Sequence, residues 1–188
     1  ANHMFAKSIF RMGIPVTPKN IFPSNIQGLP TWYDVRISEK GYLGRKEGVD
    51  LMVCVNPQSM LKDIQSVSSG GYFLYDNTKP LHKDFIREDI NYIGVPFTGI
   101  CNKEYTDPRQ RQLFKNIIYV GALSALLDIE FAVLEGLVSE QFKGKEKQEV
   151  MEEVSDFFRD SVTSSYEDLE KFLNKLQTVL LNKEAVII

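Results

Sequence analysis

Hydrophobic and polar residues alternate most regularly in the stretch that follows a proline-bounded loop. From residue 32 to residue 38 every second side chain is apolar: Tyr33, Val35 and Ile37. This period of two predicts a strand with one apolar face. The preceding loop lies between Pro23 and Pro30, whose fixed φ angles stiffen it. We therefore expect a polar binding loop supported by a rigid strand.

A second pattern begins at residue 49. Residues 49–55 form an apolar run broken only by Asp50, which is typical of a strand buried on both faces. Residues 57–67 have helical spacing, and residues 72–75 predict the next strand after Gly70 and Gly71. Strand, helix and strand in this order predict a right-handed crossover between parallel strands.

The remaining elements are mostly helical. Helices are predicted from residue 1 to Gly13, over 107–128, over 130–142 and across 145–182. Asp107 followed by Pro108 is a helix start signal, and residues 117–127 are apolar enough to be buried on most sides.

Short extended segments complete the prediction. They are a strand at 14–17 followed by a loop at 18–20, a hairpin turn at 40–41 leading into 42–45, and strands at 90–95 and 185–188. The last of these is either an edge strand or the start of a following domain.

These patterns predict an α/β protein with a mixed, largely parallel sheet flanked by helices. We expect one domain over residues 1–144, and a helical tail or the start of another domain over residues 145–188. Ligands of such sheets bind beyond the carboxyl ends of strands, where the strand order reverses. Asn56 follows the strand at 49–55 and begins the next helix, so it lies at such a point.

Composition narrows the possible functions. The net charge of −3 and a pI near 5.5 give no electrostatic reason to expect a nucleic acid or an anionic membrane as partner. No apolar run is long enough to span a membrane and no signal peptide opens the sequence, so we expect a cytoplasmic protein. The two cysteines, Cys54 and Cys101, have no metal-site spacing and are expected to be buried thiols.

No motif for self-sufficient catalysis is present. The chain has no Walker loop, no nucleophile elbow, no zinc-protease motif and no complete dinucleotide fingerprint. His3 and His82 lie outside any motif and are given no role. We expect most acidic residues to lie on solvated helix faces, and we predict neither catalytic residues nor a metal site.

Several polar residues are candidates for binding, each with a structural alternative. Ser24, Asn25 and Gln27 could hold a polar ligand or could cap their own loop. Asn56 could meet a phosphate or serve as a helix cap. Arg36 could clamp a carboxylate or phosphate, or form a surface ion pair. Asn116 precedes the apolar half of its helix, and its amide needs a partner in the protein or in a ligand.

These residues occur in a pattern that resembles a known family, the γ subunit or γ domain of 2-oxoacid:ferredoxin oxidoreductases, which act on pyruvate, 2-oxoglutarate and related 2-oxoacids. The resemblance covers most of residues 1–144. Its carriers are Asn2, Phe5-Ala6-Lys7, Met12-Gly13, Phe22-Pro23-Ser24-Asn25-Ile26-Gln27-Gly28-Leu29-Pro30-Thr31-Trp32-Tyr33, Val35-Arg36, Val49-Asp50, Asn56-Pro57, Gly70-Gly71, Tyr75-Asp76, Pro96, Asn116 and Tyr119-Val120-Gly121-Ala122-Leu123.

The resemblance implies a Rossmann-like three-layer body that helps bind coenzyme A (CoA). The residues implied to face this ligand are Ser24, Asn25, Gln27, Arg36, Asn56 and Asn116. The complete enzyme would oxidatively decarboxylate a 2-oxoacid to an acyl-CoA and reduce ferredoxin. Thiamine diphosphate and the iron–sulfur clusters would belong to partner α and β subunits, with a δ or ferredoxin-like subunit in some complexes.

Two departures from the family accompany this resemblance. Family members begin with a strand and a glycine-rich loop, which this sequence lacks before its first helix, and the likeness fades after Gly144. The alternative functions are a structural interaction module and a free-standing nucleotide-binding protein. The substrate 2-oxoacid is not specified by the sequence, since its contacts are expected from other subunits.

Overall fold

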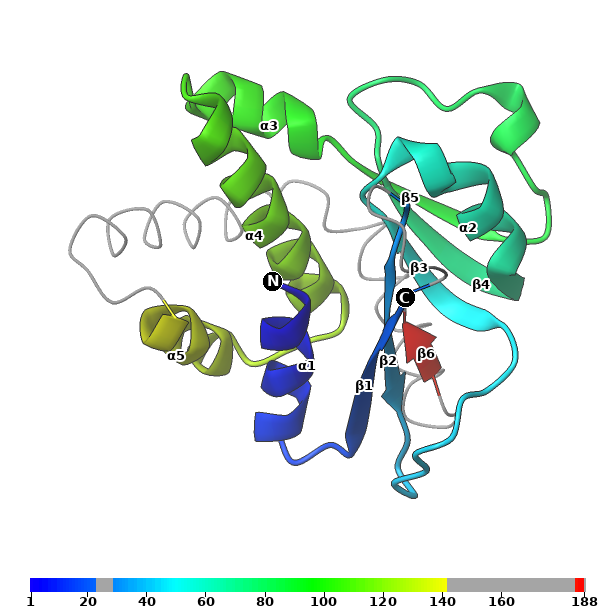
Figure 1. Cartoon of the computed structure of the whole chain (residues 1–188), viewed down its shortest axis with the longest axis vertical. Coiled ribbons are helices and arrows are strands. Elements are labelled where there is room, and N and C mark those ends of the chain that lie inside the picture. Colours follow the sequence, from blue (N-terminus) through cyan, green and yellow to red (C-terminus); the bar gives the residue numbers. More distant parts are fainter. Residues whose placement is uncertain (23–28, 142–184, 188) are drawn as a thin grey trace.

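A single sheet with helices on both sides organises the part of the chain that the structure describes (Figure 1). The computed structural model describes residues 1–22, 29–141 and 185–187. The α-helices are α1 (Asn2–Arg11), α2 (Met60–Ser66), α3 (Phe97–Glu104), α4 (Pro108–Leu126) and α5 (Phe131–Gln141), with short 3-10 turns η1 (Pro57–Ser59) and η2 (Lys83–Phe85). The strands are β1 (Val16–Ile21), β2 (Trp32–Ile37), β3 (Val49–Cys54), β4 (Val67–Asp76), β5 (Asn91–Val95) and β6 (Ala185–Ile187).

The sheet has a parallel part and an antiparallel part. Its order is β1-β2-β6-β3-β4-β5. The strands β3, β4 and β5 are parallel to one another, whereas β2 runs antiparallel to both β1 and β6. The predicted α/β class and the parallel crossover from β3 through α2 to β4 are confirmed.

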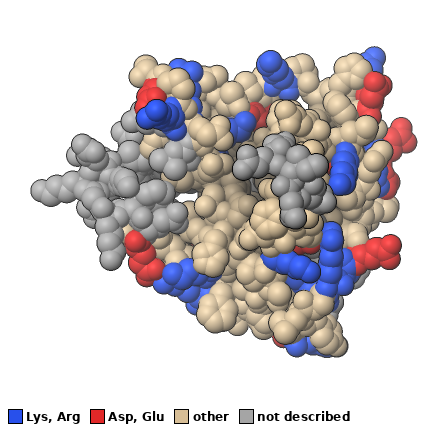
Figure 2. Space-filling view, viewed as in Figure 1, with Lys and Arg blue, Asp and Glu red and all other residues tan. Residues whose placement is uncertain are grey.

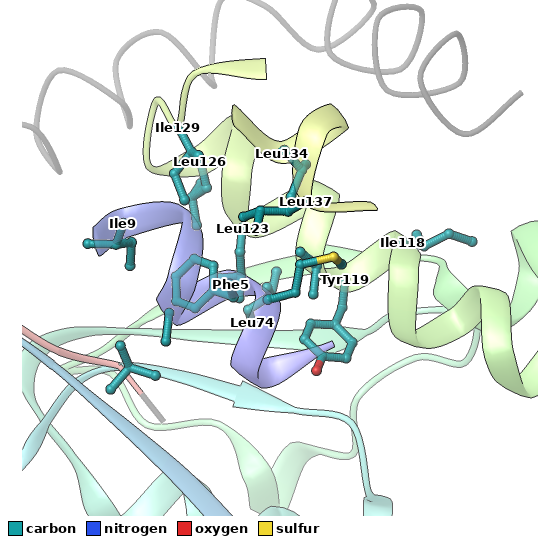
Figure 3. Packing of buried hydrophobic residues seen from close by; sticks show 14 of the residues in the cluster. Phe5, Ile9, Leu74, Ile118, Tyr119, Leu123, Leu126, Ile129, Leu134 and Leu137 are labelled. Atoms are coloured by element: carbon teal, nitrogen blue, oxygen red, sulfur yellow. The ribbon is translucent and has the colours of Figure 1, made fainter. Parts of the chain in front are cut away.

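The larger core lies between the sheet and the helices α1, α4 and α5, which occupy one side of the sheet in Figure 1. Figure 3 shows Phe5 of α1 beside Leu123 of α4, with Leu137 of α5 close by. Together with Ile9 of α1, these side chains are buried in one cluster. The apolar half of α4 is buried because it is covered by α1 and α5 as well as by the sheet, as its sequence predicted.

A second, smaller core lies under α2 on the opposite side of the sheet. Phe73 of β4 and Met52 of β3 are buried there against Ile64 of α2. Tyr72 and Leu74, the neighbours of Phe73, belong to the larger core instead. Successive side chains of a strand point to opposite faces, so β4 supplies apolar side chains to both cores.

Two predictions near the start of the chain are wrong. The loop expected at 18–20 belongs to β1, which pairs with β2 along its whole length. Pro18 is tolerated there because β1 is the edge strand of the sheet. Residues 42–45 form no strand, so the predicted hairpin after β2 is absent. Instead, β2 pairs with β1 along one edge and with β6 along the other.

Three further elements differ from expectation. Gly70 and Gly71 lie inside β4 rather than before it, at a register irregularity against β3. The helix α3 was not predicted, because its eight residues contain little amphipathic pattern. The strand β6 is not an edge strand, since it lies between β2 and β3. The helical tail predicted over 145–182 lies outside the described residues.

Candidate functional site

A pocket of about 220 Å³ lies where β2 and β3 extend past their pairing with β6. Its apolar wall is formed by Phe5, Val35, Val53, Val55 and Leu123. Its polar wall is formed by Asn2, Thr31, Asn56, Ser59, Asp63 and Asn116. Because Asn56 follows the carboxyl end of β3, the pocket lies at the edge of the sheet where the sequence predicted a ligand site.

A buried carboxylate organises the polar wall. The side chain of Asp63 on α2 is 3% exposed. Its Oδ1 accepts a hydrogen bond from Trp32 Nε1 at 2.7 Å, and its Oδ2 accepts one from Ser59 Oγ at 2.7 Å. Both oxygens are therefore occupied, which satisfies the requirement that buried polar groups find partners. Asp63 consequently fixes the side chains of two other pocket residues.

Trp32, the single tryptophan of the chain, is held from a second direction. The Lys62 Nζ lies 4.3 Å from the centre of the indole ring, which is a cation–π distance. Asp63 and Lys62 are consecutive residues of α2, so this one helix fixes both the N–H edge and a face of the indole. The rest of the ring contributes apolar surface to the pocket.

The structure brings two of the predicted site residues together. Asn56 and Asn116 both line the pocket, from the end of β3 and from α4 respectively. The Asn56 Oδ1 also accepts a hydrogen bond of 3.0 Å from the Gln58 backbone N–H, so the predicted capping role is confirmed. This bond uses only the oxygen of the Asn56 amide. Ser24, Asn25 and Gln27 lie outside the described residues.

Arg36 is not among the residues that line this pocket. Its guanidinium donates a hydrogen bond to the Gly44 carbonyl and lies 5.9 Å from the centre of the Tyr42 ring. Arg36 is four residues further along β2 than Trp32, a separation of roughly 13 Å in an extended strand. The observed contacts are structural, and a role for Arg36 in ligand binding stays a prediction.

Tyr119 connects the pocket to the start of the chain. Its hydroxyl pairs with the Asn2 Oδ1, and Figure 3 shows its ring directed toward the beginning of α1. Burial raises the pKa of Tyr119 and also that of Tyr33, so both hydroxyls stay protonated at neutral pH. Both tyrosines line the pocket as neutral groups.

Asp63 is the one charged side chain among the described residues that line the pocket, and each of its oxygens accepts a hydrogen bond, one from Trp32 and one from Ser59. The nearby Cys54 thiol is buried, which with the charge of Asp63 raises its pKa to about 12. Cys101 is buried as well, so the prediction of two buried thiols is confirmed. Among the described residues no cluster of side chains has the composition of a metal site.

A second polar cluster lies at the carboxyl ends of β4 and β5, beside another cavity of about 410 Å³. Asp76 Oδ2 is 3.1 Å from Lys115 Nζ and accepts hydrogen bonds from the N–H and hydroxyl of Thr98. Its Oδ1 accepts hydrogen bonds from the N–H and hydroxyl of Thr78. Burial acts to raise the pKa of Asp76, but these bonds outweigh it and hold the pKa at about 2. This cluster fastens α3 and α4 to the sheet.

The sequence interpretation missed Asp63 and Asp34, because acidic residues were expected on solvated faces. Both are at least 95% buried. Asp34 is paired with the Arg45 Nε at 3.2 Å. A signal existed for Asp63, since it lies three residues after Met60 and four before Val67, spacings that share one face of a helix. For Asp34 the strand pattern predicted a solvated face, and only the tertiary structure shows that this face is covered.

The fold resembles solved structures of one enzyme class. A 2-oxoglutarate:ferredoxin oxidoreductase from Magnetococcus marinus, solved with 2-oxoglutarate, CoA and succinyl-CoA bound, matches 87% of this chain with a TM-score of 0.73 and 23% identity. A pyruvate oxidoreductase subunit from Thermotoga maritima matches 85% with a TM-score of 0.61 and 19% identity. The γ subunit of a keto/oxoacid ferredoxin oxidoreductase from Geobacter sulfurreducens matches 84% with a TM-score of 0.58 and 16% identity.

The extent of these matches differs between the three proteins. The matched region is 28% of the Magnetococcus marinus chain, but 84% and 85% of the other two chains. At these identities the likeness shows the fold alone. A comparison with curated proteins gives no significant match. A family model described as pyruvate ferredoxin/flavodoxin oxidoreductase matches residues 1–163.

Within the described part of the chain, no helix combines the length and the apolar character needed to cross a bilayer.

Proposed function

Since the chain belongs to the pyruvate ferredoxin/flavodoxin oxidoreductase family, we propose that it acts as the γ component or γ domain of a 2-oxoacid:ferredoxin oxidoreductase. The family match covers most of the sequence and confirms the resemblance found from its motifs. The fold supports the same assignment, because the Thermotoga maritima and Geobacter sulfurreducens matches extend over most of two single subunits. A Rossmann-like description of the sheet and a cytoplasmic location are parts of this proposal.

The complete complex would convert a 2-oxoacid to an acyl-CoA and pass the electrons to ferredoxin. Thiamine diphosphate and the iron–sulfur clusters are assigned to partner subunits or domains. Two cysteines cannot supply the four ligands that such a cluster usually requires, and both are buried in this chain. The Asp63 oxygens in the pocket are also occupied. This chain therefore binds and positions, while the reacting groups come from its partners.

Within that complex we assign to this chain a share of the CoA site. The observation that carries the proposal is the pocket beyond the carboxyl end of β3, in which Asn56 and Asn116 face one cavity. Amide side chains both donate and accept hydrogen bonds, so they suit the amide and base groups of CoA. The Magnetococcus marinus enzyme, which has this fold in part of its chain, was solved with CoA bound.

The test is CoA-dependent acceptor reduction by the complex, assembled from this chain and its partner subunits. We expect Asn116→Ala to raise the KM for CoA about 5- to 10-fold, as expected for one lost hydrogen bond, with little change in kcat. Asn102→Ala is the control, because Asn102 is exposed on α3 and lies outside the pocket. An unchanged KM in Asn116→Ala would contradict the assignment of this residue.

Asn56 needs a pair of variants, because its side chain is also a helix cap. Asn56→Ser keeps a capping oxygen but removes the amide N–H groups, whereas Asn56→Ala removes both. If Asn56 contacts CoA, both variants raise the KM for CoA. A normal KM in Asn56→Ser together with a raised KM in Asn56→Ala would show that Asn56 acts only as a cap.

The two alternative functions predict other results. A purely structural module predicts that calorimetric titration of the assembled complex gives the same CoA affinity for all these variants. A free-standing nucleotide-binding enzyme predicts turnover by the isolated chain. A purely structural module does not account for polar residues from α1, η1, α2 and α4 lining one cavity.

A further inference from the structure

The two outer strands of the sheet, β1 and β5, differ in how their free edges are protected (Figure 1). An edge strand exposes backbone groups that can pair with another chain, and proteins commonly protect such a strand with proline or lysine. The strand β1 contains Pro18 and Lys19. The strand β5 contains neither proline nor any charged residue. Within the described part of the chain, β5 is therefore the edge that lacks these protective residues.

Hydrogen bonds at the two ends of β5 show which of its backbone groups face β4. The Val95 carbonyl accepts a hydrogen bond of 3.2 Å from the Asn77 N–H, just after the end of β4. The Asp89 carbonyl, just before β5, accepts one of 2.6 Å from the Gly70 N–H within β4. Backbone groups alternate in direction along a strand, so every second residue of β5, counted back from Val95, is directed toward β4.

The residues between these, Tyr92 and Gly94, direct their N–H and C=O groups away from β4. Among the described residues, β5 pairs with β4 alone, and no further backbone hydrogen bond reaches Tyr92 or Gly94. Gly94 is exposed, and no residue of β5 is fully buried. These two residues therefore present a pair of donors and a pair of acceptors to one additional strand.

The side chains beside this edge are apolar and fixed in position. The Tyr92 hydroxyl donates a hydrogen bond of 2.7 Å to the Phe85 carbonyl and accepts one of 2.8 Å from the Arg87 N–H. Ile86, which lies between those two residues, is 56% exposed. Ile93 is only half-buried against the larger core. An added strand would thus cover apolar surface as well as pair with the backbone.

Charge does not oppose the approach of a second copy of this chain. The net charge is only −3, and β5 itself contributes none of it. Figure 2 shows positive and negative side chains interspersed over the face in view, with no large patch of either sign. Repulsion between two copies is therefore weak.

The sequence of β5 is complementary to itself when two copies run antiparallel. With Ile93 opposite Ile93 of the second copy, Tyr92 of each copy lies opposite Gly94 of the other. The outward backbone groups of Tyr92 and Gly94 then form a hydrogen-bonded pair on either side of a two-fold axis. An aromatic residue opposite an edge glycine is a known stabilising arrangement in sheets. The same register therefore satisfies the backbone groups and the side chains.

We propose that β5 is a docking edge for a second copy of this chain, whose own β5 pairs with it antiparallel to form one continuous sheet. The closed two-fold arrangement uses the outward groups of both strands and leaves none for a third copy. None of the described residues that line the candidate pocket belongs to β5, so the pairing leaves that pocket accessible. The proposal goes beyond the proposed function and does not depend on it.

The first test is the oligomeric state of the full chain. Sedimentation equilibrium across a dilution series should show monomers and dimers. Ile93→Cys should form an intermolecular disulfide on mild oxidation, because directly opposed Cα atoms at such a position lie about 4.5 Å apart, within the span of about 4.4–6.8 Å that disulfides bridge. Cys54 and Cys101 are buried and do not compete. Asn20→Cys, an exposed position on the β1 edge, is the matched control and should stay monomeric under oxidation.

Substitution of Tyr92 tests the backbone pairing itself. Tyr92→Pro removes the outward N–H from both copies, which breaks two intermolecular hydrogen bonds and should raise the dimer dissociation constant roughly 5- to 150-fold. Tyr92→Phe keeps the N–H and the ring and should dimerise nearly as well as the wild type. Thermal unfolding identifies a variant that fails to fold. A monomer at every wild-type concentration, or equal cross-linking of Ile93→Cys and Asn20→Cys, would overturn the proposal.

Hydrogen exchange of the wild-type chain needs no substitution. The amides of Tyr92 and Gly94 should exchange more slowly in a concentrated sample than in a dilute one. The Ile93 amide, which is directed toward β4, should be protected in both samples and serves as the internal control. Protection of Tyr92 and Gly94 that arises only when partner subunits are added would assign this edge to a different protein and overturn the proposal.

Discussion

Two acidic residues, the buried Asp63 and the partly buried Asp76, are held by partners that the tertiary structure supplies. Asp63 accepts hydrogen bonds from Trp32, which lies 31 positions earlier in the chain, and from Ser59. Asp76 is joined to Thr98 and Lys115 from two later helices. Leaving a buried carboxylate without such partners costs several kcal/mol, so these contacts are requirements of the fold. The same contacts fix Trp32 and Lys115 in their positions.

Asp76 gives a pH-dependent prediction. Its folded-state pKa of about 2 lies below the ordinary value of 3.8, so its contribution to stability is complete above pH 4 and is lost as the pH falls toward 2. Asp76→Asn should lower the free energy of unfolding by about 1–2 kcal/mol at pH 7, and the difference from wild type should shrink below pH 4. Urea denaturation at a series of pH values measures this. Asp84→Asn, at a side chain that is 83% exposed, is the control and should change little.

A constant difference between Asp76→Asn and wild type from pH 7 to pH 2 would show that the carboxylate charge has no role there. The expected trend depends only on the direction of the pKa change.

Among the elements, α4 shows how a local signal and tertiary packing combine. The Asp107 side chain accepts a hydrogen bond of 3.0 Å from the Arg109 N–H, and Pro108 occupies the first turn. These two residues determine where the helix begins. The apolar second half, which includes Ile118, Leu123 and Leu126, is then buried against α1 and α5. Asn116 and Lys115 lie between these halves and face the two cavities.

This arrangement gives a prediction for the helix cap. Asp107→Ala should reduce the free energy of unfolding by about 1 kcal/mol, because the Arg109 N–H loses its partner. Asp107→Ser keeps a capping oxygen and should remain close to wild type. Chemical denaturation measures both variants. Equal loss in the two would indicate that the charge of Asp107, rather than the capping bond, stabilises α4.

The sequence pattern placed Gly70 and Gly71 before β4, but they lie inside this strand. A Cβ atom on Gly71 would lie 2.8 Å from the Ser68 carbonyl oxygen and 3.0 Å from that of Asp50. Gly70 has a φ of +76°, a conformation that favours glycine. Glycine pairs usually mark turns, but here they permit an irregularity inside β4. The local sequence gives the same signal in both cases.

At the scale of the whole molecule, the strand β6 joins the two parts of the sheet. It pairs antiparallel with β2, where Ile187 lies opposite Val35, and parallel with β3, where Ile187 lies opposite Leu51. The parallel strands and the β1–β2 pair would otherwise be separate units. The pocket lies directly beyond these pairs, so the position of β6 also determines where the cavity begins.

We expect Val186→Pro to destabilise the protein substantially, because proline cannot donate the backbone hydrogen bond of an internal strand. Val186→Thr is the matched control, since it keeps the backbone N–H and the β-branched shape. Thermal unfolding should show a melting temperature at least several degrees lower for the proline variant alone. Equal melting temperatures for wild type and Val186→Pro would mean that β6 contributes little to joining the sheet.

Local periodicity in the sequence was sufficient to predict β2, β3, β5, α1, α4 and α5, since each element shows its own apolar spacing or cap signal. It also identified Asn56 and Asn116 as candidates and the end of β3 as the location of a site. The tertiary structure decided which polar residues meet, because the contacts of Trp32 with Asp63 and of Asp76 with Lys115 join segments far apart in the chain. It also decided that β6 lies between β2 and β3, because strand pairing depends on backbone edges that no side-chain pattern records.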